Sequence, residues 1–262
     1  GVRCLVQRGR MFVVEGQGKR TLFLFSPEGV KSFYELPEEQ ASKGVADWMM
    51  LVRKLPDELF DGRRTIMHEL FGRDDVRVVV ITGSEGAFSA GAALVGENPI
   101  EHFDVTAMDR ANRLIRAVLR LDKPVLAGVN GIAAGVGCSL AIACDLQIAR
   151  ESAMFLLAFG RIGLTCDGGT SATLAASVGR AKAMRMALLA EPMTAREAAK
   201  AGLISHVVPD GEYDDALAKL THRLSQGAPL AFAATKKLIN ATSLAQVDQA
   251  LERERSAQSA LF

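Results

Sequence analysis

The sequence has few of the residues that mark metal centres, disulfide frameworks or membrane spans. Its four cysteines (Cys4, Cys138, Cys144 and Cys166) form no C-x-x-C pair and have no histidine at ligand spacing, so we expect no bound metal. No apolar run approaches the ~20 residues that cross a bilayer, and the first ten residues contain no apolar segment typical of a secretory signal. These absences predict a cytoplasmic protein without a membrane partner.

An excess of charge of either sign is also missing. The chain has 31 basic and 30 acidic side chains, and this balance argues against nucleic acid as a partner. Hydrophobic residues make up 49% of the sequence and charged residues 23%, which indicates a globular protein rather than a disordered one. A chain of 262 residues can form one or two domains around a large buried core.

Strand-like and helix-like segments alternate from residue 76 onward. The run VVVIT at residues 78–82 is continuously apolar and rich in β-branched residues, as in a strand buried within a parallel sheet. The alternation predicts an α/β fold with largely parallel strand pairing. Strands are expected at residues 11–14, 21–25, 78–82, 124–129, 146–149 and 154–157, and helices at 105–121, 134–143, from 173 onward, from 229 and at 244–261.

Local signals add detail to this pattern. The first two predicted strands flank a Gly-Gln-Gly turn at residues 16–18, which favours a hairpin. Two short helices are expected before the α/β region, one beginning near residue 27 and one at 44–55. Thr194 and Glu197 have the spacing of a capping box and therefore predict the start of a helix.

Two glycine-rich junctions follow predicted strands, at residues 86–93 and 130–137. Small residues allow a ligand to approach the backbone, and free N–H groups at a helix N-terminus attract negative charge. Two such groups aimed at one oxygen would form an oxyanion hole. Glycine-rich turns are also common as purely structural features, and that alternative stays open. Neither junction matches a nucleotide-binding glycine motif, so a nucleotide site is not expected.

Five segments in a consistent order carry a resemblance to a known family. They are FSAGAA (88–93), KPVLAGVNGIAAGVGCSLAIACDLQIA (123–149), IGLTCDGGTS (162–171), AREAAKAGLISHVV (195–208) and APLAFAATKKLIN (228–240). From about residue 75 to the end, the chain resembles the crotonases, the enoyl-CoA hydratases and isomerases. The resemblance implies a ββα spiral core at 75–195 and a helical trimerisation region at 196–262, after an atypical segment at 1–74.

The same resemblance implies the chemistry of the site. The substrate would be an acyl-CoA thioester that itself carries the coenzyme A, with no separate cofactor, and the assembly a homotrimer or a dimer of trimers. The backbone N–H groups of Ala92 and Val136 would stabilise an enolate. Valine at 136 replaces the family's usual glycine, and Ala93 replaces an acidic residue. The residues expected to bind substrate are Ala90, Gly91, Ala93, Leu94, Gly135, Ser139 and Phe159.

The acidic residues of the site differ from those of family hydratases. The two glutamates that handle water in those enzymes correspond here to Ser139 and Phe159, so hydration by two carboxylates is not expected. Asp167 remains, at a position where family isomerases carry an aspartate that moves a proton and a dehalogenase branch carries a nucleophile. Burial would raise its pKa and suit it to proton transfer. Alternatively, Asp167 only caps the helix that begins near Gly168.

Several functions therefore remain open at this point. Isomerisation of a carbon–carbon double bond is favoured over hydration. The alternatives are a catalytically silent protein that binds acyl-CoA or serves assembly, a hydratase with a non-standard route, and a dehalogenase-like or thioester hydrolase enzyme. The resemblance also suggests that Lys236 and Lys237 lie near the coenzyme A phosphates, although a solvated helix face fits them equally well.

The first part of the chain departs from the family pattern. Residues 6–71 resemble the N-terminal region of haem-thiolate cytochrome monooxygenases, and they lack the crotonase N-R-P…N-A-L pattern that supplies contacts to coenzyme A. None of the four cysteines lies in a haem-ligand loop, so haem binding is not expected.

Overall fold

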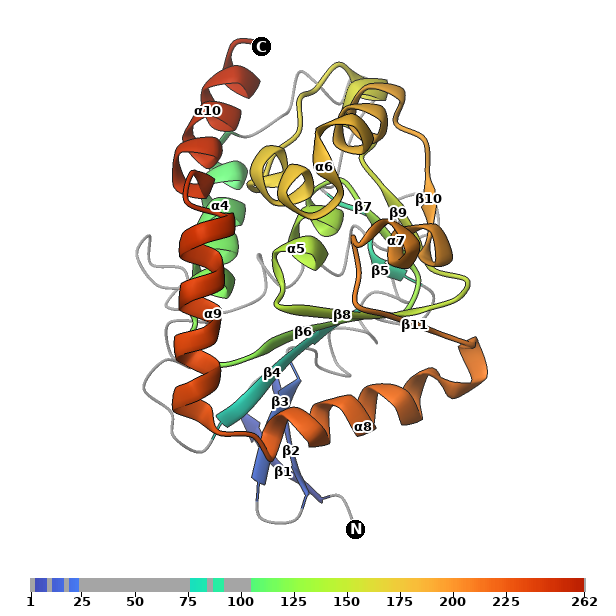
Figure 1. The fold of residues 1–262 in the computed structure, drawn as a ribbon, viewed down its shortest axis with the longest axis vertical. Coiled ribbons are helices and arrows are strands. Elements are labelled where there is room, and N and C mark those ends of the chain that lie inside the picture. Colours follow the sequence, from blue (N-terminus) through green and yellow to red (C-terminus); the bar gives the residue numbers. More distant parts are fainter. Residues whose placement is uncertain are drawn as a thin grey trace.

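The computed structural model describes residues 3–8, 11–16, 19–23, 76–83, 87–91 and 105–261 (Figure 1). Within these ranges the protein has a larger and a smaller sheet with helices packed around them. The larger sheet contains, in spatial order, β1 (Arg3–Arg8), β2 (Met11–Gly16), β3 (Lys19–Phe23), β4 (Val76–Thr82), β6 (Val125–Val129), β8 (Leu146–Arg150) and β11 (His206–Val208). The smaller sheet contains β10 (Met193–Thr194), β9 (Met154–Leu156), β7 (Ile132–Ala134) and β5 (Ala87–Ser89).

The helices follow the expected order. They are α4 (Val105–Arg120), α5 (Val136–Ala143), α6 (Thr170–Leu189), α7 (Ala195–Ala201), α8 (Tyr213–Ser225), α9 (Pro229–Ser243) and α10 (Val247–Ser259), with 3-10 turns η3 (Phe159–Ile162) and η4 (Asp210–Glu212). The mixed α/β fold with parallel central strands is therefore confirmed.

Helices cover both faces of the larger sheet, which explains the continuous apolar run at residues 78–81 of β4. Val78 and Val80 of β4 face one side, where they pack in a cluster with α8. Val79 and Ile81 face the other side and join the main core with α4 and α5. Figure 1 shows α8 below the sheet and α5 above it. Since a parallel strand buried on both faces cannot alternate polar and apolar residues, the run at 78–82 has this composition.

The N-terminal hairpin is present and extends the sheet. β2 pairs antiparallel with β3, and β3 pairs parallel with β4, with Phe23 opposite Val80. The sheet thus continues across the predicted boundary at residue 74. The helices expected near residue 27 and at 44–55, and most of the cytochrome-like stretch, lie outside the described residues.

One feature of the smaller sheet differs from the sequence prediction. Residues 132–134 form strand β7 between β5 and β9, so the helix expected from residue 134 begins only at Val136. Helix α6 begins at Thr170, close to the start expected near Gly168, and is kinked at Gly179. The Thr194–Glu197 capping box is formed as predicted, with each side chain bonded to the other residue's backbone.

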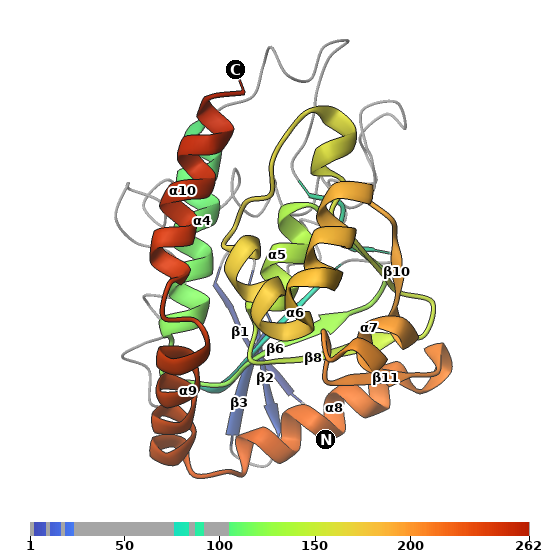
Figure 2. The same ribbon diagram turned by 45° about the horizontal axis from the view of Figure 1, so that its top comes forward.

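Helix α10 lies along α4 in both ribbon views (Figures 1 and 2). Arg116 of α4 bonds to Asp248 and Glu252 of α10, at 3.0 and 2.6 Å. Nearer the end of α10, Arg255 bonds to Asp109 at 2.6 Å. These ion pairs bind the last helix to the body of the protein.

Candidate active site

The parallel pairing of β5 with β7 brings the two glycine-rich junctions together. Ala87 lies opposite Ile132, so the segments that follow the two strands leave the sheet at the same edge. Gly91 has a φ of +96°, and a Cβ there would lie 2.9 Å from the carbonyl oxygen of Ala134. Gly135 has a φ of +53°, and a Cβ there would lie 3.8 Å from the Cα of Gly91. Both positions thus require glycine, and the two backbones lie in contact.

Val136, one of the two predicted oxyanion donors, is the first residue of α5. Its N–H therefore has no carbonyl partner within the helix and lies at the positive end of the helix dipole. Its side chain is buried, so the valine methyl groups pack inward. The N–H of Gly91, in the other junction, donates a hydrogen bond to the hydroxyl of Ser89 at 3.3 Å.

The other residues predicted in the first junction are only partly placed. Ala90 is half-buried and follows β5 directly. Ala92, the second predicted donor, and the neighbouring Ala93 and Leu94 lie outside the described residues. Of the two predicted oxyanion donors, the described residues therefore include Val136 alone.

Asp167 lies in the turn between η3 and α6, directly against the N-terminal end of α5. Its carbonyl oxygen accepts hydrogen bonds from the hydroxyls of Ser139, at 3.0 Å, and Thr170, at 2.7 Å. Gly168 follows with a φ of +66°, and a Cβ there would lie 2.8 Å from the Cβ of Ser139 and 3.6 Å from a methyl carbon of Val136. The structure therefore brings Val136, Ser139 and Asp167 together.

The carboxyl group of Asp167 is buried, and within the described residues its Oδ1 atom has no hydrogen-bond partner. Burial, together with the negative charge of Glu254, raises the pKa of Asp167 to about 7. The capping alternative is wrong for the side chain, because the N-cap of α6 is Gly169 and no side chain caps it. A buried carboxyl that titrates near neutral pH can both accept and return a proton.

The two positions at which hydratases carry glutamate have different surroundings here. Ser139 is fully buried, and its hydroxyl supports the backbone of the Asp167 turn. Phe159 is nearly buried, and its ring lies 3.7 Å from where a Cβ of Gly135 would be. An aromatic ring against Gly135 makes this wall of the site apolar, and that excludes water.

The sequence reasoning missed two residues of α10 that hold the Asp167 turn. The Glu254 carboxylate accepts hydrogen bonds from the N–H groups of Gly169, at 2.7 Å, and Ser171, at 2.8 Å. Gln258 accepts one from the N–H of Thr165 at 2.8 Å. Their spacing of four residues, which places both on one helix face, was the only sequence signal. Charged and amide residues in a terminal helix ordinarily face solvent.

Lys236 is not positioned for a phosphate. Its ammonium group forms a buried ion pair with Asp145 at 2.8 Å and also donates to the carbonyl oxygen of Val118 at 2.8 Å. Both predictions for Lys236, a contact to coenzyme A and a solvated helix face, are therefore wrong. Lys237, in contrast, is exposed.

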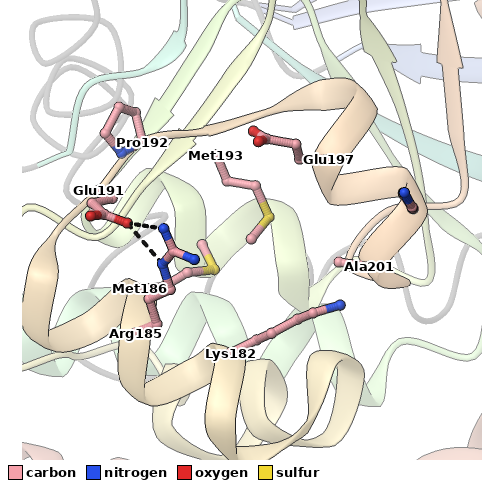
Figure 3. A pocket seen from close by; sticks show the side chains of 9 residues that line it. Lys182, Arg185, Met186, Glu191, Pro192, Met193, Glu197 and Ala201 are labelled. Carbon is pink, nitrogen blue, oxygen red and sulfur yellow. Dashed lines mark hydrogen bonds and ion pairs between the residues drawn. The ribbon is translucent and has the colours of Figure 1, made fainter.

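A separate cavity of about 330 Å³ lies between the second half of α6, β10 and α7 (Figure 3). Met186 and Met193 line it, and Arg185 pairs with Glu191 at its edge at 2.8 Å. It contains none of the residues predicted for the site. In the parts of the chain that the structure describes, no cluster of three or more metal-ligating side chains occurs, and no helix is long and apolar enough to cross a membrane.

The two sheets and their surrounding helices, with the N-terminus of α5 close to a buried aspartate, match the fold of crotonases. A solved structure of an enoyl-CoA hydratase from Mycobacterium avium subsp. paratuberculosis K-10 aligns with 97% of this chain and 90% of its own, at a TM-score of 0.75 and 37% identity. The sequence pattern of the enoyl-CoA hydratase/isomerase family matches residues 54–262. This chain belongs to the enoyl-CoA hydratase/isomerase family.

Two curated relatives are similar over most of the chain. A probable enoyl-CoA hydratase of Rhodobacter capsulatus is 42% identical over 171 residues, which cover 64% of this chain and 66% of the relative. The 1,2-epoxyphenylacetyl-CoA isomerase of Escherichia coli K12 is 35% identical over 192 residues, 71% of this chain and 73% of the relative. The family match begins at residue 54, earlier than the predicted start near 75, and so overlaps the cytochrome-like stretch.

Proposed function

We propose that this chain isomerises a carbon–carbon double bond in an acyl-CoA thioester, with Asp167 as the group that moves the proton. The observation that carries the proposal is the buried carboxyl of Asp167, with a pKa raised to about 7, beside the N-terminus of α5. Ser139 and Phe159 stand where a hydratase would hold its two water-handling glutamates. Such a site can move a proton between two carbons but lacks the pair of carboxylates for adding water.

The reaction needs no partner besides the substrate. The Asp167 carboxylate removes a proton from the α carbon, and the electron pair moves toward the thioester carbonyl to form an enolate. The N–H groups of Val136 and Ala92 stabilise the oxyanion, and each such donor is worth roughly a hundredfold or more in rate. The protonated Asp167 then returns the same proton to the γ carbon. Atoms and charge balance without water, metal or oxidant.

The relatives support two different outcomes. The E. coli relative is named as an isomerase of an epoxide, 1,2-epoxyphenylacetyl-CoA, and so supports isomerisation of an acyl-CoA only in general, whereas the Rhodobacter protein named as a probable hydratase favours hydration by a non-standard route. The apolar wall formed by Phe159 favours isomerisation, because a site that adds water must admit and orient it.

A pair of substrates separates these alternatives. We expect the protein to convert a 3-enoyl-CoA to its conjugated 2-enoyl isomer, seen as a rise in ultraviolet absorbance of the thioester. With crotonyl-CoA we expect no loss of that absorbance, because no water is added. Asp167→Asn abolishes isomerisation, while Asp210→Asn, a change at an exposed carboxylate, leaves it unchanged. Rapid hydration of crotonyl-CoA or full activity of Asp167→Asn would contradict the proposal.

The silent alternative needs a binding measurement. Calorimetry with crotonyl-CoA and with a saturated acyl-CoA tests whether the chain binds the ligand class at all. Binding without turnover of either unsaturated substrate supports a non-catalytic acyl-CoA protein. Absence of binding contradicts both the enzyme and the silent binder.

We also propose assembly as a homotrimer or a dimer of trimers. Large apolar side chains are exposed on two helices, Leu188 and Leu189 on α6 and Leu230, Leu238 and Ile239 on α9. Exposed apolar patches of this kind mark surfaces that another protein surface covers. Light scattering coupled to size-exclusion chromatography measures the assembly mass, and a monomer at micromolar concentration would contradict the proposal.

A further inference from the structure

Glu254 holds the Asp167 turn from the far end of the chain. Its side chain is buried, and its two carboxylate oxygens each accept a backbone hydrogen bond, from Gly169 at 2.7 Å and from Ser171 at 2.8 Å. One helical turn later, Gln258 accepts the N–H of Thr165 at 2.8 Å. These two side chains of α10 thus form hydrogen bonds with the backbone on both sides of Asp167.

The contact also compensates the N-terminus of α6. Gly169, the N-cap, offers no side chain to the first N–H groups of that helix. Glu254 supplies the missing acceptors from another helix, and its negative charge faces the positive end of the helix dipole. Hydrogen bonds to a carboxylate are roughly twice as strong as neutral ones, so the turn has a firm anchor.

Glu254 and Asp167 have two carboxyl groups near one another with different hydrogen-bond environments. Burial raises the pKa of Glu254, and the hydrogen bonds from Gly169 and Ser171 to its carboxylate oppose that rise. Among the described residues no group donates to Oδ1 of Asp167, and burial together with the negative charge of Glu254 disfavours its ionisation. The carboxyl that accepts two backbone hydrogen bonds is therefore better supported as an anion, and the other is better suited to carry the proton.

The surroundings of Asp167 contain few other titratable groups. In the described part of the chain, Cys166 of the same turn is the other one, and burial raises its pKa to about 11, so it stays neutral. From α5 and α6 the turn meets the uncharged hydroxyls of Ser139 and Thr170. Among the described residues, the charge that acts on the pKa of Asp167 is that of Glu254.

We propose that Glu254 is a positioning residue of the isomerisation, which fixes the Asp167 turn against α5 through its two backbone hydrogen bonds and, through the negative charge of its ionised form, favours the proton on Asp167. This inference rests on the proposed function. Gln258 also holds the Asp167 turn in place, through its hydrogen bond from Thr165, but it carries no charge. The two residues can therefore be separated by experiment.

The test compares pH–rate profiles for 3-enoyl-CoA isomerisation in the wild type and three variants. Glu254→Gln removes the charge and leaves one of the two N–H groups facing an amide donor. We expect kcat to fall roughly tenfold or more, because small displacements of a catalytic group are costly, while KM changes little. We also expect the midpoint on the acid side of the profile to move to lower pH, because a like charge has gone.

Two further variants separate geometry from charge and from a general effect on α10. Gln258→Met is expected to lower kcat without moving the midpoint. Arg253→Gln, which changes an exposed charged residue on the same helix, is expected to change neither. If Glu254→Gln does not fold, Glu254→Asp takes its place, keeping the charge but shortening the reach, and should lower kcat at an unchanged midpoint. A kcat and a midpoint that do not respond to changes at 254 would overturn the proposal.

A second measurement distinguishes this inference from the proposed function. If the wild type does not isomerise any 3-enoyl-CoA, the proposed function fails, but Asp167 still titrates in the folded protein. The shift in urea unfolding midpoint caused by Asp167→Asn at pH 8 is then compared in the wild type and in the Glu254→Gln background. We expect a smaller shift in the variant background. An equal shift contradicts the electrostatic role of Glu254 regardless of activity.

Discussion

Replacing Asp167 with asparagine should stabilise the protein, and more strongly at alkaline than at acidic pH. Asp167 is 7% exposed, and one oxygen of its carboxyl group has no partner in the described structure. Asparagine has nearly the same shape and cannot ionise. The variant therefore removes the cost of holding a charge at this position while it leaves the packing of the turn in place.

The magnitude follows from the raised pKa. The ordinary value is 3.8 and the folded value about 7, so between these pH values the folded state binds more protons than the unfolded state. Stability therefore falls as pH rises through this interval, and above pH 7 the loss is complete. With about 1.4 kcal/mol for each pH unit, the penalty that asparagine removes is roughly 2 kcal/mol at pH 5 and roughly 4 kcal/mol at pH 8.

Urea unfolding of wild type and variant at pH 5 and pH 8, at equal protein concentration, measures this difference. Effects of other titrating groups are common to both proteins and cancel. Asp210→Asn provides a control of opposite sign, because the pKa of the exposed Asp210 is lowered by its bonds to Ser152, and its loss should destabilise slightly. A gain from Asp167→Asn that is the same at both pH values, or a loss at pH 8, would refute the assignment of a raised pKa.

Two more substitutions test the parts that place the site. Gly91→Ala puts a Cβ 2.9 Å from the carbonyl oxygen of Ala134 at a φ of +96°. We therefore expect about 1–3 kcal/mol of destabilisation in urea unfolding and a fall in kcat in the isomerase assay. Gly211→Ala, at a position with open space around it, should leave both unchanged. Lys236→Met leaves Asp145 buried without its cation and should cost about 3–5 kcal/mol in urea unfolding. Adding Asp145→Asn should restore part of that loss, and a double variant as unstable as the sum of both single changes would speak against the ion pair.

The sequence was most informative where a local rule decides the structure. The β-branched run at 78–82, the Thr194 capping box and the hairpin at residues 11–23 all formed, because each depends on neighbours in the chain. The strands β5 and β7 have only three residues each, too few to show a period of two, and their pairing with each other is a long-range contact.

For the site, motif resemblance brought Val136, Ser139 and Asp167 into one hypothesis, and the structure places them together. It could not reveal Glu254 or the buried pairing of Lys236. Charged side chains are buried only when a distant partner meets them, and that partner is set by tertiary packing rather than by nearby sequence.

The hydrogen bonds from α10 to the Asp167 turn bear on the order in which parts of the chain can fold during synthesis. Glu254 is 85 residues after Gly169, and its helix is the last one of the chain as described. During synthesis the sheets and α6 emerge from the ribosome well before the residues that anchor the turn. The hydrogen bonds that Glu254 and Gln258 make to the Asp167 turn can therefore form only when translation has passed residue 258.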